Sequence, residues 1–136
     1  ELAIKNHSKN LGISLHESVA YLGLCYKDLV VRLGIKNAKK EFERKGRNAF
    51  FPLTVMKRII DDISPNLVIT TNSPRSEAAA IEIANSHNIE TLAMTDLFTG
   101  FSDYKINSKN ITFFCDLAQK NFIRDELVDK KNQIFL

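Results

Sequence analysis

The chain is poor in the residues that mark several protein classes. It has two cysteines, three prolines, five glycines and no tryptophan among 136 residues. Cys25 and Cys115 stand apart in apolar surroundings, with no Cys-x-x-Cys pair and no Cys/His cluster. We therefore expect reduced thiols rather than a disulfide framework or a zinc site, and reduced thiols favour a cytoplasmic setting.

Long apolar runs are also missing. No segment approaches the roughly 18 apolar residues that a membrane span requires. The first residues, Glu1 to Lys5, lack the basic and apolar regions of a signal peptide. Hydrophobic residues still make up 44% of the chain, which is enough for a packed core. We expect a single folded domain over residues 1–136.

Several catalytic signatures are absent as well. The sequence contains no Gly-x-Gly-x-x-Gly, Gly-x-x-x-x-Gly-Lys-Ser/Thr, Gly-x-Ser-x-Gly or His-Glu-x-x-His motif. These motifs mark dinucleotide oxidoreductases, P-loop NTPases, serine hydrolases and zinc proteases. The sequence gives none of these classes support, and we expect neither a cofactor nor a bound metal.

Charge is distributed unevenly. The net charge is +3, yet residues 27–60 hold ten Lys/Arg against three Asp/Glu, a local +7 that leaves −4 for the rest. The basic residues concentrate within residues 36–47. Such a segment can meet nucleic acid, anionic lipid or a phosphorylated substrate, but a solvated helix face is the reading we favour. No nucleic-acid-binding signature accompanies it, so a nucleic-acid contact module using residues 36–47 is a third hypothesis that rests on charge alone. Peripheral membrane contact through the same residues is a further candidate.

Helix and strand patterns alternate along the first half of the chain. The spacing of apolar residues predicts helices over residues 1–11, 21–33 and 52–63. Apolar and polar residues alternate over residues 13–19, which predicts a half-buried strand. Residues 35–50 are less periodic, and a helical excursion or a loop would both fit them.

The clearest unit is a strand, a helix and a second strand, over residues 67–71, 74–88 and 91–95. Ser73 suits the N-cap of this helix, and Pro74 suits its first position because its φ is fixed. The pattern repeats as a strand, a helix and a strand over residues 111–115, 117–127 and 133–136, with Asp116 as a candidate cap. Parallel strands need such crossovers. We predict an α/β fold: a Rossmann-like, three-layer domain with a mainly parallel sheet and helices on both faces.

Polar residues at the first predicted strand end form a candidate binding site. Thr71, Asn72 and Ser73 follow the strand and precede a helix, with Arg75 nearby. Backbone N–H groups at a helix start can hold a phosphate or a carboxylate, so we assign these four residues to substrate binding. Ordinary capping, with Arg75 in solvent, is the alternative.

Two further residues are candidates for catalysis. Asp96 ends the next predicted strand and could accept a sugar hydroxyl or act as a base. His16, on the predicted strand of residues 13–19, could reach the same rim, and histidine commonly transfers protons near neutral pH. A loop or structural hydrogen bond is the alternative for each.

An aromatic loop follows Asp96. Phe98 and Phe101 flank Gly100 in residues 97–104. Aromatic faces can stack on a sugar or a base, so this loop could cover a substrate. It could equally fold back as a hydrophobic plug.

One family resemblance rests on the order of these segments. Residues 59–65 read IIDDISP at a helix end, residues 66–70 read NLVIT, and residues 88–94 read NIETLAM after a helix of small residues. This order resembles the N-terminal domain of two-domain GT-B sugar-nucleotide enzymes, which include glycosyltransferases and UDP-N-acetylglucosamine 2-epimerases. The resemblance covers about residues 51–136. Asn66 and Glu90 stand where that family usually has Asp and Pro.

The resemblance implies an acceptor-side domain in glycan biosynthesis. Its partners would be a sugar nucleotide, a glycan acceptor and a C-terminal domain beyond residue 136, and a first strand with its glycine-rich turn would precede residue 1. The parent would be a glycosyltransferase or a sugar-nucleotide epimerase, and the isolated chain would be inactive. A non-catalytic small-ligand-binding or regulatory α/β module is the alternative.

Overall fold

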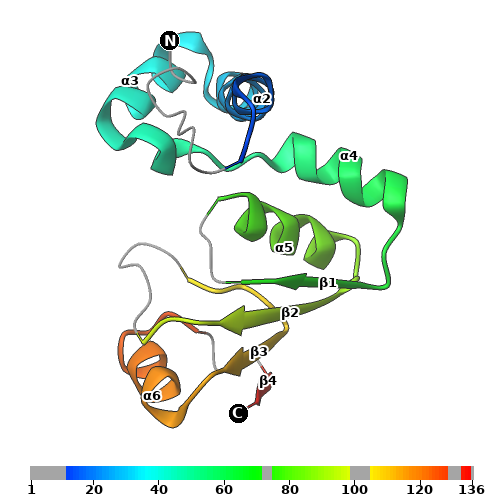
Figure 1. The fold of residues 1–136 in the computed structure, drawn as a ribbon, viewed down its shortest axis with the longest axis vertical. Helices are drawn as coiled ribbons and strands as arrows, with labels where there is room; N and C mark the ends of the chain where they lie inside the picture. The colour runs from blue at the N-terminus through cyan, green and yellow to red at the C-terminus, as the bar shows by residue number, and fades with distance from the viewer. Residues whose placement is uncertain (1–11, 72–74, 99–104, 129–132, 136) are drawn as a thin grey trace.

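A computed structural model describes residues 12–71, 75–98, 105–128 and 133–135. The predicted helix over residues 1–11 lies outside them. Figure 1 shows α2 and α3 above α4 and α5, with the sheet below and α6 beside it. The elements, in chain order, are α2 (Leu15–Leu33), α3 (Ile35–Lys45), the 3₁₀-helix η2 (Gly46–Ala49), α4 (Leu53–Ile63), β1 (Leu67–Thr70), α5 (Ser76–Ser86), β2 (Glu90–Thr95), β3 (Asn110–Phe113), α6 (Asp116–Arg124) and β4 (Gln133–Phe135).

The sheet is parallel throughout its described strands. Its order is β1-β2-β3-β4, so neighbours in sequence are neighbours in space. Thr70 of β1 pairs with Ala93 of β2, and Thr95 of β2 pairs with Phe113 of β3. The predicted α/β class with a Rossmann-like, mainly parallel sheet and surrounding helices is confirmed.

Helix packing covers the two faces of the sheet unequally. Ile81 of α5 and Phe122 of α6 join Ala93 in one cluster of buried side chains. Ile69 and Met94 project from the opposite face, because side chains alternate along a strand. They are 57% and 49% exposed. The main core of the sheet therefore lies under α5 and α6.

A second core joins the helices that precede the sheet. It is made of buried residues from α2, α3 and the segment that follows them: Leu22, Cys25, Leu29, Ala38, Ala49 and Phe50. Phe42 stacks on Phe50 with ring centroids 5.5 Å apart. Helix α4 connects this core to the sheet layer, since it packs along α5 and buries Ile60. No helix within the described residues is long and apolar enough to cross a membrane.

The predicted strand over residues 13–19 is wrong, because this stretch starts a helix. Ser14 is the N-cap of α2, and its Oγ accepts the N–H of Glu17 at 3.1 Å. The Glu17 carboxylate accepts the N–H of Ser14 at 2.8 Å in return. This capping box satisfies donors that a helix start leaves free. His16 thus lies in the first turn of a helix and not on a strand.

Two predicted helix starts also shift. Helix α5 begins at Ser76, with Arg75 at its N-cap position and no side-chain cap. The predicted cap Ser73 and first residue Pro74 lie outside the described residues. Helix α6 begins at Asp116 with Cys115 as its N-cap. Asp116 is therefore not the cap but the first helical residue, where a negative charge is favoured by the helix dipole.

Candidate functional site

The carboxyl ends of β1 and β2 lie at one edge of the sheet. Thr70 is the last residue of β1 and pairs with Ala93 of β2. Because β2 continues to Thr95, Asp96 lies past the ends of both strands. Asp96 is exposed. Thr70 is only 7% exposed, and its Oγ1 has no hydrogen-bond partner among the described residues. Ligands of open parallel sheets commonly bind at this edge.

The start of α5 already carries a negative side chain. Glu77 lies in the first turn of α5, and its Oε2 accepts a hydrogen bond from Thr71 Oγ1 at 2.7 Å. This carboxylate stabilises the helix start and competes with any anion that approaches Thr71. Asn72 and Ser73, which the sequence assigns to the same binding site, lie outside the described residues.

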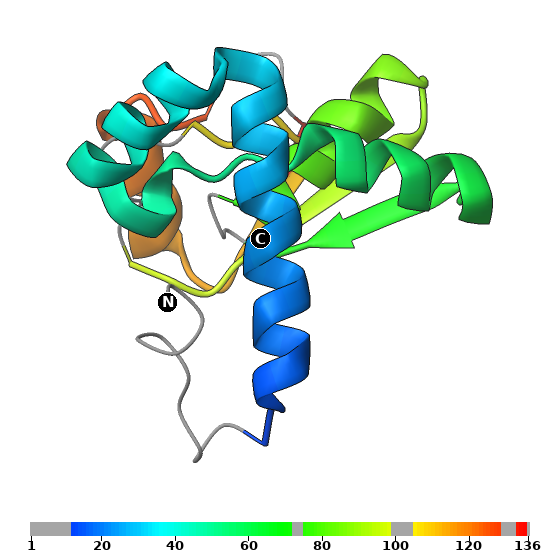
Figure 2. The same cartoon turned by 90° about the horizontal axis from the view of Figure 1, so that it is seen from above.

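Helix α2 forms a wall beside the start of α5. The hydroxyl oxygen of Tyr21 on α2 lies 2.7 Å from Oγ of Ser76, the first residue of α5. Figure 2 shows α2, in blue, as a long helix that passes the other elements with its C-terminal half and extends beyond them with its N-terminal half. The rim at β1 is thus lined by a helix that comes earlier in the chain.

A buried thiol lies one helical turn beyond Tyr21. Cys25 is 1% exposed, and this burial raises the pKa of its thiol. A hydrogen bond with Tyr21 lowers that pKa, the charge of Asp28 raises it, and the charges of Arg75 and Arg47 lower it. The charges of both arginines therefore act on the same thiol.

Neither arginine is neutralised by a described carboxylate. Arg47 belongs to η2, and its buried Nε has no hydrogen-bond partner among the described residues. The Arg75 side chain has neither an ion pair nor a hydrogen bond there. The nearby carboxylate of Asp28 accepts from Arg32 Nε at 3.1 Å and from the Thr54 N–H at 2.8 Å. Guanidinium groups bind phosphates and carboxylates bidentately, so this arrangement suits an anion.

The described part of the aromatic loop packs against the end of β3. Phe98 meets Phe114 edge to face, with ring centroids 4.8 Å apart. Asn121 of α6 donates to the backbone oxygen of Phe98 at 2.8 Å. Phe98 nevertheless remains 56% exposed, so its ring is held in place while part of it stays accessible. Phe101 lies outside the described residues.

No family model, curated protein or solved structure matches this chain.

The structure brings together some of the predicted site residues and leaves others apart. Thr71, Arg75 and Asp96 lie at the carboxyl edge. His16 is exposed in the first turn of α2, and within the described residues no contact joins it to Asp96 or Arg75. In the same part of the chain, no three His, Cys, Asp or Glu side chains gather as a metal site would need.

Three residues of the site, Tyr21, Cys25 and Arg47, were missed from the sequence. Tyr21 and Cys25 stand four positions apart, a spacing that places both on one face of a helix, so their association was open to prediction once the helix was assigned. Arg47 carries no comparable local signal. It reaches Cys25 only through the packing of α3 and η2 on α2.

The basic segment over residues 36–47 forms most of α3. Glu41 pairs with Arg44 and with Lys45, at 2.8 Å in each case, and these contacts lower the pKa of Glu41. Lys36 and Lys39 remain exposed. The segment is thus a solvated helix face with part of its charge paired internally, and its contact with a membrane stays a prediction.

Proposed function

We propose that this chain binds a phosphorylated small molecule where α2 meets the start of α5. The observation that carries the proposal is the buried Nε of Arg47, which has no hydrogen-bond partner among the described residues. Arg75, at the start of α5, supplies a second positive charge. A phosphate bound by these guanidinium groups would accept from their N–H donors and neutralise their charge. The hydroxyls of Tyr21 and Ser76 are further donors at the same place.

The narrower form of the proposal is the acceptor-side domain of a GT-B-like glycosyltransferase or sugar-nucleotide-converting enzyme. The parallel α/β fold and the segment order over residues 51–136 support it. The arginines would hold a phosphate of the acceptor or of the sugar nucleotide, and Asp96 would accept a sugar hydroxyl. The free thiols of Cys25 and Cys115 fit a cytoplasmic enzyme. A non-catalytic ligand-binding module would use the same arginines without Asp96.

Ligand titration tests the binding step. Saturation-transfer NMR and calorimetry would compare a UDP-sugar, inorganic phosphate and an uncharged sugar. We expect the phosphate-bearing ligands to bind, with affinity that falls as salt rises. Arg47→Ala and Arg75→Ala should each weaken binding about tenfold or more, because a hydrogen bond to a charged group contributes roughly 1.5–3 kcal/mol.

The matched control is Arg44→Ala, which removes an exposed arginine of α3 that already pairs with Glu41. It should leave the affinity unchanged. If all three variants lose the same affinity, the loss reflects the lower net charge of the protein and contradicts the proposed site. In the parent enzyme, Asp96→Asn should abolish turnover without weakening ligand binding. Unchanged turnover would contradict the glycosyltransferase or epimerase proposal, whereas the proposal of a non-catalytic ligand-binding module would stand.

A further inference from the structure

The start of α5 offers a hydrogen-bond acceptor as well as donors. Glu77 lies in the first turn of α5, where its Oε2 accepts from Thr71 Oγ1 at 2.7 Å. Its second carboxylate oxygen, Oε1, accepts no hydrogen bond within the described residues. Because this anionic oxygen repels a fully ionised ligand, it limits which anions can bind here.

Backbone donors lie in the same turn of α5. The first backbone hydrogen bond of the helix runs from the N–H of Ala79 to the carbonyl oxygen of Arg75 at 3.0 Å. The N–H groups of Ser76, Glu77 and Ala78 therefore have no acceptor among the described residues. Such free N–H groups, together with the positive end of the helix dipole, attract anions.

A buried hydroxyl at the end of β1 indicates a ligand independently of the helix. Thr70 is 7% exposed, yet its Oγ1 has no hydrogen-bond partner among the described residues. It lies on the face of β1 that α5 covers, since Ile69 projects from the opposite face. The hydrogen bond between Thr71 and Glu77 holds the start of α5 at this strand end. A bound oxyanion would supply the acceptor that the Thr70 hydroxyl lacks.

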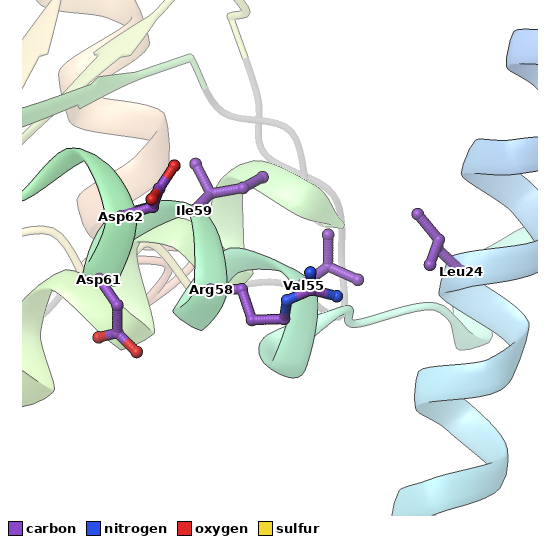
Figure 3. A pocket seen from close by; sticks show the side chains of 6 residues that line it. All are labelled: Leu24, Val55, Arg58, Ile59, Asp61 and Asp62. Atoms are coloured by element: carbon purple, nitrogen blue, oxygen red, sulfur yellow. The ribbon is translucent and has the colours of Figure 1, made fainter.

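The hollow between α4 and α2 suits an anion less well. It measures about 720 Å³, and Figure 3 shows Arg58 in its lining together with Asp61 and Asp62 of the same helix. The lining thus offers one cation against two carboxylates, and its other side chains are apolar. An anion is therefore favoured at the start of α5, where Arg75 and the backbone donors accompany a single carboxylate.

We infer that the ligand of the α5 site carries a terminal phosphate group with a proton still on one of its oxygens. This inference rests on the proposed function. The ionised oxygens would accept from Thr70 and from the N–H groups of α5, while the protonated oxygen would donate to Glu77. A phosphate monoester has a second pKa of about 6, so part of it keeps this proton near neutral pH.

Two related anions lack such a proton. Sulfate and phosphate diesters are fully ionised near neutral pH, so neither has an oxygen that can donate to Glu77. Each would set an anionic oxygen against the Glu77 carboxylate. The site should therefore prefer a terminal phosphate to both, which favours the phosphate of an acceptor over the diphosphate of a sugar nucleotide.

Calorimetry of the full chain with inorganic phosphate, sulfate and dimethyl phosphate tests this inference. All three are tetrahedral oxyanions, but only phosphate has a proton to donate near neutral pH. The wild type should bind phosphate about tenfold or more tightly than either of the others. Glu77→Gln should bring the sulfate affinity to within about twofold of the phosphate affinity, because the amide can donate to an ionised oxygen.

Glu82→Gln is the matched control. It removes the same charge from α5 away from the first turn, and the new side chain can still accept from Asn107. This variant should keep the preference for phosphate. Circular dichroism checks the fold of both variants, and the comparison of ligands on the wild type depends on neither.

The outcomes separate this inference from the proposed function. If the wild type binds phosphate and sulfate equally, the inference is overturned and the proposed binding site stands. If a folded Glu77→Gln variant keeps the full preference for phosphate, the inference is overturned as well. If none of the three anions binds, the proposed function fails and the inference fails with it.

Discussion

At the residue scale, Asp28 joins two helices from a buried position. It is 3% exposed on α2 and holds Arg32 with one carboxylate oxygen and the backbone N–H of Thr54 with the other. Thr54 lies in the first turn of α4, whose N-cap residue, Pro52, gives no side-chain cap. Asp28 therefore caps α4 from a distance and fixes it relative to α2.

Removing this carboxylate should destabilise the chain strongly. Asp28→Ala leaves the Thr54 N–H and the Arg32 guanidinium without their partner, and we expect a loss of about 2–4 kcal/mol in the free energy of unfolding. Asp28→Asn should lose less, because an amide oxygen still accepts from Thr54. Urea unfolding measures both. A loss no larger than that of the exposed control Glu43→Ala would contradict the capping role.

The capping box at the start of α2 gives a second prediction at this scale. Ser14→Ala removes the acceptor for the Glu17 N–H, and we expect a loss of about 1 kcal/mol. Ser18→Ala, one turn further into the helix, is the control and should have little effect, since alanine favours helices. Thermal unfolding followed by circular dichroism compares the two. Equal melting temperatures for both variants would count against the box.

At the element scale, strands β1, β2 and β3 were predicted and the start of α2 was missed. Strands β1, β2 and β3 match short apolar runs bounded by polar residues, a pattern whose length favours a strand over a helix. Apolar and polar residues alternate over only seven positions in residues 13–19, and this alternation was given more weight than a stronger local signal. Ser14 and Glu17 have the spacing of a capping box, which predicts a helix start at this place.

Only those residues of the candidate site that follow the ends of strands could be predicted from the sequence. Parallel strands place Thr71 and Asp96 at one edge whatever surrounds the sheet. Tyr21 joins that edge because α2 packs beside α5, and the charge of Arg47 acts on the Cys25 thiol because η2 packs on α2. Such packing depends on contacts between distant segments, which no local pattern in one sequence reveals.

The contact between α4 and α5 should respond to acid. Asp61 of α4 accepts from Lys57 at 2.6 Å and lies 3.0 Å from Nε2 of His87, just after α5. The Lys57 contact, followed by that of His87, holds the pKa of Asp61 below its usual value. The charged carboxylate thus favours the folded state, so its stabilisation is complete above about pH 4 and is lost as the pH falls through the lowered pKa.

Asp61→Asn measures this contribution. The variant should be less stable than the wild type near neutral pH, and the difference should shrink as the solution is acidified below about pH 4. Urea unfolding at several pH values gives the comparison. Glu43→Gln, on an exposed part of α3, should show no such pH-dependent difference. If the difference in the free energy of unfolding between wild type and variant grows as the pH falls, the result contradicts a lowered pKa of Asp61.

At the scale of the whole molecule, the chain has two cores rather than one. The cluster around Leu29 belongs to α2, α3 and the segment after them, and the cluster around Ile111 belongs to the sheet, α5 and α6. Helix α4 and a few polar contacts, such as that of Tyr21 with Ser76, connect the two. The proposed ligand site lies on this connection, so a bound phosphate would couple the two cores.

Hydrogen exchange should resolve the two cores as separate units. Leu29→Ala removes a side chain that is 1% exposed, and such cavities cost about 2–5 kcal/mol. We expect faster amide exchange in α2 and α3, with β2 and β3 still protected, because local unfolding follows cooperative units. Ile111→Ala, in the sheet core, should produce the reverse pattern. If either substitution accelerates exchange equally in the helices and the sheet, the chain unfolds as one unit and the division into two cores fails.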